Sequence, residues 1–280
     1  MGRVLVTGAA GLIGRAVLDR LSGTEVTALV REPAELPAGR VVVGDAADPA
    51  VVADALDGVD RVIHLAAIPA PIGVEPVELF ATNTQATFAV LDGAGRAGVR
   101  AAAIASSYAI SGLPFATRPL RMPYLPVDAA LPLQATDPYA LAKRADELTA
   151  DMVHRTYGTT VVALRLPFVG TVDDRLPAMA RRYAADPASG ASDVWSYLDA
   201  RDAADALVRA LTPAEPGCHV VYVAAPDTLT DRPTDELLDA FHPDVPRPHF
   251  PGRAVPIDLD PARDLLGFTA AHPYPVEGTR

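Results

Sequence analysis

A glycine-rich turn near the start of the chain constrains the fold more than any other feature. Residues 3–7 form an apolar run typical of a buried parallel strand, and a helical stretch begins a few residues later. Between them, glycines spaced G-x-x-G-x-x-G allow a tight turn, close packing of helix on strand, and close approach of a diphosphate to the helix N-terminus. We therefore predict a dinucleotide-binding turn made by Gly8, Ala10, Gly11, Leu12, Ile13 and Gly14.

Predicted strands and helices alternate along the first part of the chain. This alternation predicts an α/β fold with a doubly wound parallel (Rossmann) sheet, whose ligands bind at the carboxyl ends of the strands. We expect residues 1–170 to form the dinucleotide-binding domain. Residues 171–280 should form mostly a small, loop-rich substrate lobe, with Rossmann elements interleaved at about 194–224. The expected strands are 25–30, 40–43, 61–65, 101–105 and 161–166, and the long helical regions are 74–98 and 138–158.

Lys143 is the only lysine in the chain, although Lys and Arg together number 24. It follows Tyr139 by four residues on a predicted helix with Asp137 as a suitable N-cap, so both side chains lie on one helix face. A lysine carries a compact charge, and an ammonium beside a phenol favours the phenolate. The pair is therefore a candidate acid–base site. The alternative is an ordinary amphipathic helix with a lysine that reaches toward solvent.

Composition and charge exclude several classes of partner. The net charge of −11 disfavours nucleic acid and anionic membranes, and no apolar run is long enough to span a bilayer. A single cysteine, Cys218, leaves no internal disulfide and fits a reducing cytoplasm, which is the expected location. His242, Asp244 and His249 lie in a proline-broken segment without ligand spacing, so we predict no metal site.

The end of the second predicted strand bears on the choice of cofactor. An acidic residue at this position holds the ribose hydroxyls of NAD, whereas an arginine accommodates the 2′-phosphate of NADP. Arg31 stands there and favours NADP(H), with Arg15 as a second cation near the glycine turn. Glu32 follows directly and suits the ribose of NAD, so NAD(H) stays open.

These features together resemble the short-chain dehydrogenase/reductase superfamily, in particular its extended, NAD-dependent epimerase/dehydratase-like branch. The resemblance covers about the first 170 residues in the expected order and continues in later segments. The stretches that carry it are residues 7–14, Gly44-Asp45, residues 64–67, Asn83, Ser106-Ser107, Tyr139 with Lys143, and residues 165–167, 195–199, 201–204 and 262–268.

The resemblance implies a role for each matching residue. Tyr139 is the expected acid–base, and Lys143 binds the nicotinamide ribose and tunes Tyr139. Ser107, rather than Ser106, is expected to hydrogen-bond the substrate oxygen. Asn83, the only asparagine, matches a family position on the central helix and completes the expected catalytic set. Further cofactor contacts are expected from Asp45, Ala46, Leu65, Ala66, Ala67, Pro167 and Val169, and substrate contacts from Tyr108, Phe115, Phe168 and Trp195.

Departures from the family pattern narrow the expected reaction. Tyr108 and Ala109 follow Ser107, where 4,6-dehydratases carry an Asp-Glu pair, and this argues against that reaction. Ser111 replaces a common tyrosine and changes the pocket locally. Five prolines between residues 112 and 136 predict an ordered, irregular loop that forms a wall or lid of the substrate site.

We therefore expect an NAD(P)-dependent oxidoreductase of the ketoreductase or alcohol dehydrogenase type, with NADP(H) favoured. It should act on a carbonyl or hydroxyl carbon of a small-molecule or sugar-derived substrate. A nucleotide-sugar epimerase with tightly held NAD is the alternative reaction. The alternative of another class is a non-catalytic dinucleotide sensor, which would not need Ser107, Tyr139 and Lys143 together. The expected partners are a small-molecule substrate and, as one option, a second copy of the chain in a homodimer.

Overall fold

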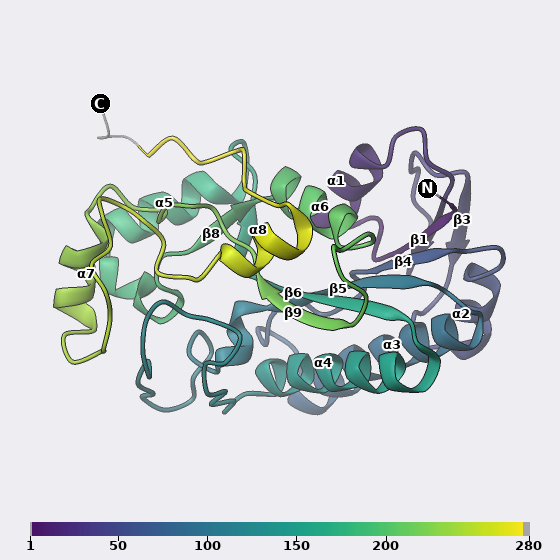
Figure 1. The fold of residues 1–280 in the computed structure, drawn as a ribbon, viewed down its shortest axis with the longest axis horizontal. Coiled ribbons are helices and arrows are strands. Elements are labelled where there is room, and N and C mark those ends of the chain that lie inside the picture. Colours follow the sequence, from purple (N-terminus) through teal and green to yellow (C-terminus); the bar gives the residue numbers. More distant parts are fainter. Residues whose placement is uncertain (1, 277–280) are drawn as a thin grey trace.

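A seven-stranded parallel sheet forms the centre of the molecule, with strand order β3-β2-β1-β4-β5-β6-β9 (Figure 1). The computed structural model describes residues 2–276. The chain winds outward from β1 in both directions, so the order confirms the predicted doubly wound, Rossmann-type sheet. The strands are β1 (Val4–Thr7), β2 (Val26–Val30), β3 (Arg40–Val43), β4 (Arg61–His64), β5 (Ala101–Ser107), β6 (Thr160–Leu166) and β9 (Cys218–Tyr222).

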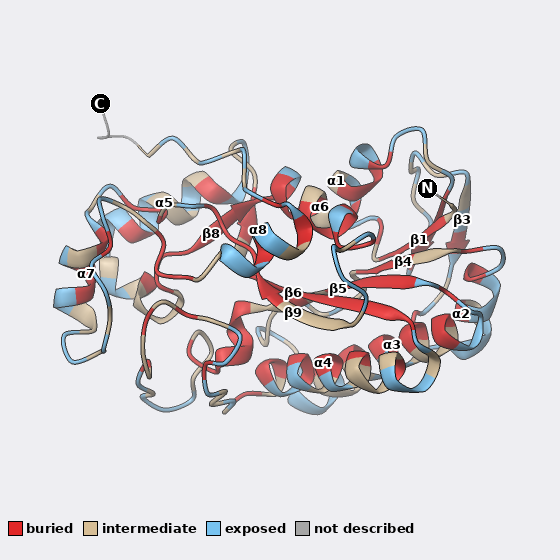
Figure 2. Ribbon diagram, viewed as in Figure 1, coloured by how far each residue is buried: buried red, intermediate tan, exposed pale blue. Residues whose placement is uncertain are grey.

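Helices cover both faces of this sheet (Figure 1). One hydrophobic cluster lies between the sheet and α1 (Leu12–Arg20), α6 (Ala200–Arg209) and α8 (Asp260–Leu266). A second cluster lies between the other face and α2 (Pro49–Ala55), α3 (Pro76–Arg96) and α4 (Pro138–Tyr157). Figure 2 shows buried residues along the inner strands and on the sheet-facing sides of the helices. The inner strands are covered on both faces, which explains why they are apolar throughout instead of alternating.

A second lobe lies at the end of the sheet where β5 and β6 terminate. It contains a two-stranded parallel sheet of β7 (Phe168–Gly170) and β8 (Tyr197–Asp199), and the helices α5 (Arg175–Ala185) and α7 (Thr234–Phe241). Two 3-10 helices, η1 (Tyr108–Ser111) and η2 (Pro187–Asp193), complete it. Its core combines side chains from residues 113–131 with side chains from residues 176–257, so distant segments of the chain build it together. Among residues 2–276, no helix has the length and apolar character needed to cross a membrane.

Helix α4 begins and ends where the sequence indicates. The Asp137 carboxylate accepts hydrogen bonds from the backbone N–H groups of Tyr139 and Ala140, each at 2.9 Å, which caps the helix. The helix ends at Gly158, whose φ of 75° lies in the left-handed region that glycine adopts without strain. These two ends fix the register that brings Tyr139 and Lys143 toward the carboxyl end of β5.

Candidate active site

Two adjoining hollows lie at the carboxyl ends of the strands. The first, which we call the glycine-turn hollow, measures about 470 Å³ and lies between the turn after β1, the end of β2 and the loop after β4. The second, the tyrosine cavity, measures about 680 Å³ and is lined by Tyr139 and by parts of the second lobe. Gly8, Gly11, Leu65 and Ala67 line both hollows, so together they form one continuous cleft.

The glycine turn has the geometry that a dinucleotide requires. Gly8 has a φ of +65°, and a side chain there would meet the backbone of Leu65 and Ala66 at 2.8 Å. A side chain at Gly14 would lie 2.4 Å from the carbonyl oxygen of Gly8, so only glycine lets α1 approach β1 this closely. Gly11 is the N-cap of α1 and no side chain caps this helix, so its first N–H groups are available to an anion.

The predicted cofactor residues all line the cleft. Those in the glycine-turn hollow are Gly8, Ala10, Gly11, Arg31, Asp45, Ala46, Leu65, Ala66 and Ala67. Those in the tyrosine cavity include Leu12, Ile13, Gly14, Lys143, Pro167 and Val169. The cavity also receives Ser107, Tyr139 and three of the four predicted substrate contacts, namely Tyr108, Phe115 and Phe168. A dinucleotide therefore fits with its diphosphate at α1 and its far end beside Tyr139.

The side chains of Tyr139 and Lys143 lie together on one face of α4. The Lys143 ammonium is 5.8 Å from the centre of the Tyr139 ring, and only 7% of Tyr139 is exposed. Phe115 packs edge-on against the ring with 5.7 Å between ring centres. The ammonium donates to the Ala105 carbonyl at 2.9 Å, which anchors it to the end of β5. Tyr139 is thus held between an apolar wall and a fixed positive charge.

Two buried carboxylates lie next to this pair on α4. Asp146 accepts a hydrogen bond from the Lys143 ammonium at 3.2 Å. Burial alone would lower the pKa of Lys143, but Asp146 and, less strongly, Tyr139 and Glu147 outweigh burial, so that pKa is raised. Glu147 forms a bidentate ion pair with Arg165, with both N···O distances at 2.9 Å. The lysine therefore stays charged.

The two neighbouring serines at the end of β5 have different partners. Ser106 donates to Glu147 at 2.7 Å and is 3% exposed, so its hydroxyl hydrogen is already engaged. The Ser107 oxygen accepts from the Ala109 N–H at 3.1 Å as the N-cap of η1, which leaves its own hydroxyl hydrogen free to donate. Of the two, Ser107 is therefore better placed to donate to a substrate oxygen.

A buried chain of polar groups holds the loop after β4. The Thr7 hydroxyl accepts from the backbone N–H groups of Leu65 and Ala66, at 3.1 and 3.2 Å, so its hydrogen points to Nδ1 of His64 at 2.8 Å. Nε2 of His64 then carries the proton and donates to the Thr87 hydroxyl at 3.1 Å. Burial, helped by the nearby Lys143 charge, lowers the pKa of His64 to about 3. This neutral histidine fixes the wall shared by the two hollows.

Arg31 and Asp45 meet at the outer end of the glycine-turn hollow. Their side chains form an ion pair at 3.4 Å and are 71% and 48% exposed. Asp45 also accepts from the Ala47 N–H at 2.9 Å. Arg15, by contrast, folds back to the Ala10 carbonyl at 3.1 Å and lines neither hollow. Of these two arginines, only Arg31 lines the glycine-turn hollow.

The model of the NAD dependent epimerase/dehydratase family matches residues 4–224. The chain belongs to this family. The resemblance to the extended branch of the short-chain dehydrogenases/reductases is therefore confirmed. The predicted class of protein, an oxidoreductase enzyme of the short-chain dehydrogenase/reductase type, agrees with membership of this family.

Several curated proteins are similar in sequence to this chain. A uronate dehydrogenase from Pseudomonas putida is 32% identical over 169 residues, which cover 59% of this chain and 60% of that protein. A dTDP-glucose 4,6-dehydratase from Streptomyces niveus is 32% identical over 185 residues, which cover 58% of this chain and 52% of that protein. The matched regions thus span less than two thirds of these two curated relatives.

Solved structures support the fold over nearly the whole chain. A short-chain dehydrogenase/reductase superfamily protein from Agrobacterium tumefaciens with bound NAD superposes with a TM-score of 0.73 at 24% identity. It covers 97% of this chain and 93% of its own. A mutated uronate dehydrogenase superposes with a TM-score of 0.62 at 25% identity, over 89% of this chain and 82% of its own.

Asn83, predicted as a member of the catalytic set, lines neither hollow. The residue is fully buried on α3. Its amide oxygen accepts from the Ile68 N–H at 2.7 Å, and its amide nitrogen donates to the Ile68 carbonyl at 3.0 Å. Both polar groups of the side chain are thereby used to hold the loop after β4. Asn83 is a positioning residue.

Trp195 also departs from its predicted place at the substrate. It is fully buried, its ring nitrogen donates to the Pro187 carbonyl at 2.7 Å, and its ring packs 5.9 Å from that of Phe241. Val194 and Trp195 have left-handed φ values of 50° and 53°, which turn the ring into the core of the second lobe. A substrate contact for Trp195 is therefore withdrawn.

The proline-rich loop is mostly part of the second lobe's core. Only its start, at Pro114 and Phe115, lines the tyrosine cavity. Farther along, the Leu125 N–H donates to the Pro246 carbonyl at 3.0 Å, and the Val127 N–H donates to the Pro256 carbonyl at 2.9 Å. The predicted wall is thus limited to two residues, and the remainder is an anchored structural segment.

Several polar residues that line the tyrosine cavity were not predicted from the sequence. Arg175 and Arg182 reach it from α5, and Asp193 reaches it from the end of η2. Their segment has no family motif among those recognised above, although the arginines stand seven residues apart and so share one side of a helix. That spacing is the feature of the sequence that could have indicated a basic helix face beside the cavity.

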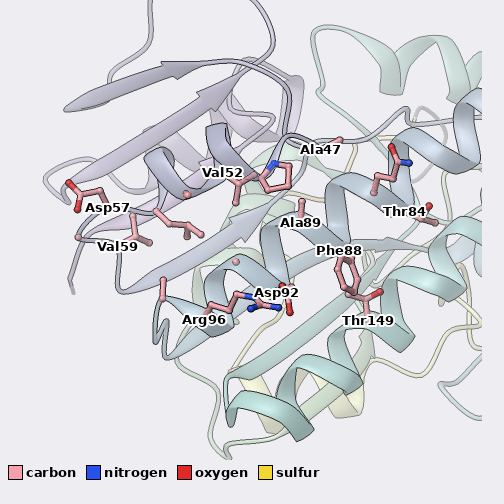
Figure 3. A pocket seen from close by; sticks show the side chains of 17 residues that line it. Ala47, Val52, Asp57, Val59, Thr84, Phe88, Ala89, Asp92, Arg96 and Thr149 are labelled. Carbon is pink, nitrogen blue, oxygen red and sulfur yellow. Dashed lines mark hydrogen bonds and ion pairs between the residues drawn. The ribbon is translucent and has the colours of Figure 1, made fainter.

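Another hollow lies away from these residues, between α2 and α3 (Figure 3). It measures about 980 Å³, and its lining includes Val52, Phe88 and Asp92. The carboxylate of Asp92 is already bonded to Arg96 and Tyr157, each at 2.7 Å. No predicted catalytic residue reaches this groove, so its size does not make it the reaction site.

Proposed function

We propose that this chain is a nicotinamide-dependent dehydrogenase that acts on a free, sugar-derived substrate. The observation that carries the proposal is the convergence of Ser107, Tyr139 and Lys143 on one cavity that continues into the glycine-turn hollow. A bound nicotinamide dinucleotide would supply the hydride acceptor or donor. The glycine turn and the free end of α1 fit its diphosphate.

The chain's own groups would handle the proton. In oxidation, Ser107 donates a hydrogen bond to the substrate hydroxyl oxygen, and Tyr139 as phenolate accepts the hydroxyl proton. Lys143, held by the Ala105 carbonyl, stabilises the phenolate by its charge and lies where a nicotinamide ribose would bind. In reduction, Tyr139 returns the proton to the same oxygen.

The polar wall of the tyrosine cavity supports a sugar acid in particular. The Arg175 guanidinium lies 4.9 Å from the centre of the Phe168 ring and forms no ion pair with any described residue. Arg182 lies on the same wall. A carboxylate on the substrate would match these cations by charge-assisted hydrogen bonds. The similarity to two uronate dehydrogenases, one by sequence and one by structure, points in the same direction.

NADP(H) is the finer proposal for the cofactor. An exposed ion pair such as Arg31–Asp45 stabilises by about 0–1 kcal/mol, whereas a hydrogen bond to a charged group contributes roughly 1.5–3 kcal/mol. A 2′-phosphate would therefore displace Asp45 from Arg31. Two observations favour NAD(H) instead. The description of the family names NAD, and Glu32, whose carboxylate suits the ribose hydroxyls of NAD, lines the same hollow.

A homodimer through α3 and α4 is a further proposal. Val77 and Phe88 on α3, and Leu141 and Leu148 on α4, are 81%, 50%, 51% and 53% exposed. Val77 and Phe88 are eleven residues apart, and Leu141 and Leu148 are seven residues apart, so the members of each pair lie on one side of their helix. Because the two helices pack against each other, a second copy of the chain can cover both at once.

The test is an assay of nicotinamide reduction with a panel of free hexuronates, free hexoses and simple alcohols. Tyr139→Phe should abolish turnover and leave cofactor affinity nearly unchanged, while Lys143→Met should impair both. Retention of more than about a tenth of the rate in Tyr139→Phe, a loss under ~1.4 kcal/mol, would remove the proposed acid–base. Cofactor binding without turnover of any compound would favour a non-catalytic sensor instead.

A further inference from the structure

Ser106, which directly precedes Ser107 at the end of β5, bonds a buried carboxylate instead of donating to a substrate. Its hydroxyl donates to Oε1 of Glu147 on α4 at 2.7 Å, and this hydrogen bond is buried. The bond ties the carboxyl end of β5 to α4. Because consecutive residues of a strand point to opposite sides, the direction in which Ser106 is held also sets the direction of Ser107.

The carboxylate that accepts this bond is itself fixed. Nε of Arg165 on β6 donates to Oε1 of Glu147, and Nη2 of the same guanidinium donates to Oε2, both at 2.9 Å. Both side chains are almost fully buried. Two parallel charge-assisted bonds define the orientation of a carboxylate as well as its distance. Ser106 is therefore bonded to an acceptor that cannot rotate without breaking one of them.

The residue after Ser107 is held by contacts that lead back to the same arginine. The Arg165 guanidinium lies 5.2 Å from the centre of the Tyr222 ring. The Tyr222 ring meets the Tyr108 ring edge-on, with 6.0 Å between ring centres. Ser107 thus stands between two anchored neighbours, Ser106 before it and Tyr108 after it.

We propose that Ser106 is a positioning residue: held by Glu147, it fixes the Ser107 hydroxyl at the place from which it donates to the substrate oxygen. The Ser106 hydroxyl acts through Ser107. Precise placement matters because a displacement of about 1 Å at a reacting group can cost roughly 100-fold in rate. The inference rests on the proposed function, since it names a residue that serves the proposed substrate donor.

The kinetic test is a double-mutant cycle of wild type, Ser106→Ala, Ser107→Ala and the double variant, with D-glucuronate as the substrate. Ser106→Ala should lower kcat/KM about tenfold, mainly through kcat. In the Ser107→Ala background the same substitution should change kcat/KM by less than about twofold, because the group that Ser106 positions is gone.

Ser196→Ala is the matched control. Ser196 is also fully buried, its hydroxyl donates to the Asp193 carbonyl at 2.6 Å, and it lines neither hollow. This variant should keep the wild-type rate. Losses from Ser106→Ala and Ser107→Ala that multiply in the double variant would overturn the proposal, because Ser106 would then act independently of Ser107. A wild-type rate in Ser106→Ala would overturn it too.

A second measurement needs no substrate. The Ala109 N–H donates to the Ser107 oxygen at 3.1 Å, so its hydrogen exchange reports how firmly Ser107 is held. NMR follows this exchange in wild type, Ser106→Ala and Ser196→Ala, with the amide of Val6 in β1 as the reference for global opening. Ser106→Ala should speed exchange at Ala109 about tenfold relative to Val6, and Ser196→Ala should not.

An unchanged exchange ratio in Ser106→Ala would overturn the positioning role. If wild type oxidises no sugar, the proposed function fails, and the exchange at Ala109 still decides whether Ser106 holds Ser107. Failure of the proposed function and failure of the positioning role are therefore distinguishable.

Discussion

The Lys143 ammonium lies 3.2 Å from a carboxylate oxygen of Asp146, one helical turn away, and the two side chains are 6% and 2% exposed. The second oxygen of Asp146 has no partner among the described residues, so the ammonium is its main counter-charge. An ion pair this deeply buried is strongly coupled: removing one member leaves the other charged in an apolar environment. Asp146 thereby acts on Tyr139 through Lys143.

We predict that Asp146→Asn moves the alkaline limb of kcat/KM to lower pH. Without the carboxylate, burial disfavours the charged lysine, so the raised pKa of Lys143 falls and the ammonium is lost at a lower pH. The measurement is the pH profile of the variant against wild type. Asp151→Asn, on the same helix but 44% exposed, is the matched control and should keep the wild-type profile. Superimposable profiles for all three proteins would show that Asp146 is only structural.

The sequence predicted those parts of the site in which neighbouring positions determine the geometry. Tyr139 and Lys143 share one helix whose cap and stop are visible in the chain, and the glycine turn follows directly from a strand. Trp195 was misjudged because the direction of a buried side chain depends on tertiary packing. Two consecutive left-handed residues turn Trp195 inward, and no periodicity indicates them. Arg175, Arg182 and Asp193 reach the tyrosine cavity only because the second lobe assembles from distant segments.

His64 should make the protein less stable as the pH falls from about 6.5 toward 3. In the unfolded chain it takes up a proton near 6.5, whereas in the folded state its pKa is about 3, so the unfolded state binds more protons in this window. The free energy of unfolding should therefore decrease by about 1.4 kcal/mol per pH unit from this residue alone. Urea unfolding of wild type and His64→Gln at pH 7, 6 and 5 measures how the free energy of unfolding of each protein changes with pH.

The comparison variant His64→Gln should be less stable at pH 7, because its buried hydrogen bonds are altered, but its stability should depend less on pH. The surface control His249→Gln, whose side chain is 78% exposed, should follow the wild-type slope. An unchanged slope in His64→Gln would mean that other groups cause the acid sensitivity.

A dimer through α3 and α4 should dissociate when charge is placed on the exposed apolar residues. Phe88→Glu combined with Leu148→Glu would put two carboxylates per chain into an apolar interface, where burying an unpaired charge is costly. Light scattering after size-exclusion chromatography should then show a monomer where wild type shows a dimer. Val43→Glu, on the edge strand β3 and 48% exposed, should remain dimeric. A monomeric wild type would rule out the proposed dimer.

The cofactor preference should depend on Arg31 and on the carboxylate that it contacts. We predict that NADPH binds about tenfold more tightly than NADH, because a phosphate gains a charge-assisted bond that NADH lacks. Arg31→Ala should narrow this gap, and so should high salt. Asp45→Asn should widen it, because Arg31 would no longer be shared with a competing anion at 3.4 Å. Arg15→Ala is the matched control, since Arg15 lines neither hollow, and it should leave the gap unchanged. Fluorescence titration with NADPH and with NADH measures the two affinities in wild type and in the three variants. If wild type binds NADH more tightly, or if Arg31→Ala leaves the preference unchanged, the NADP(H) proposal fails. Glu32 would then be the residue that hydrogen-bonds the ribose hydroxyls, and the cofactor would be NAD.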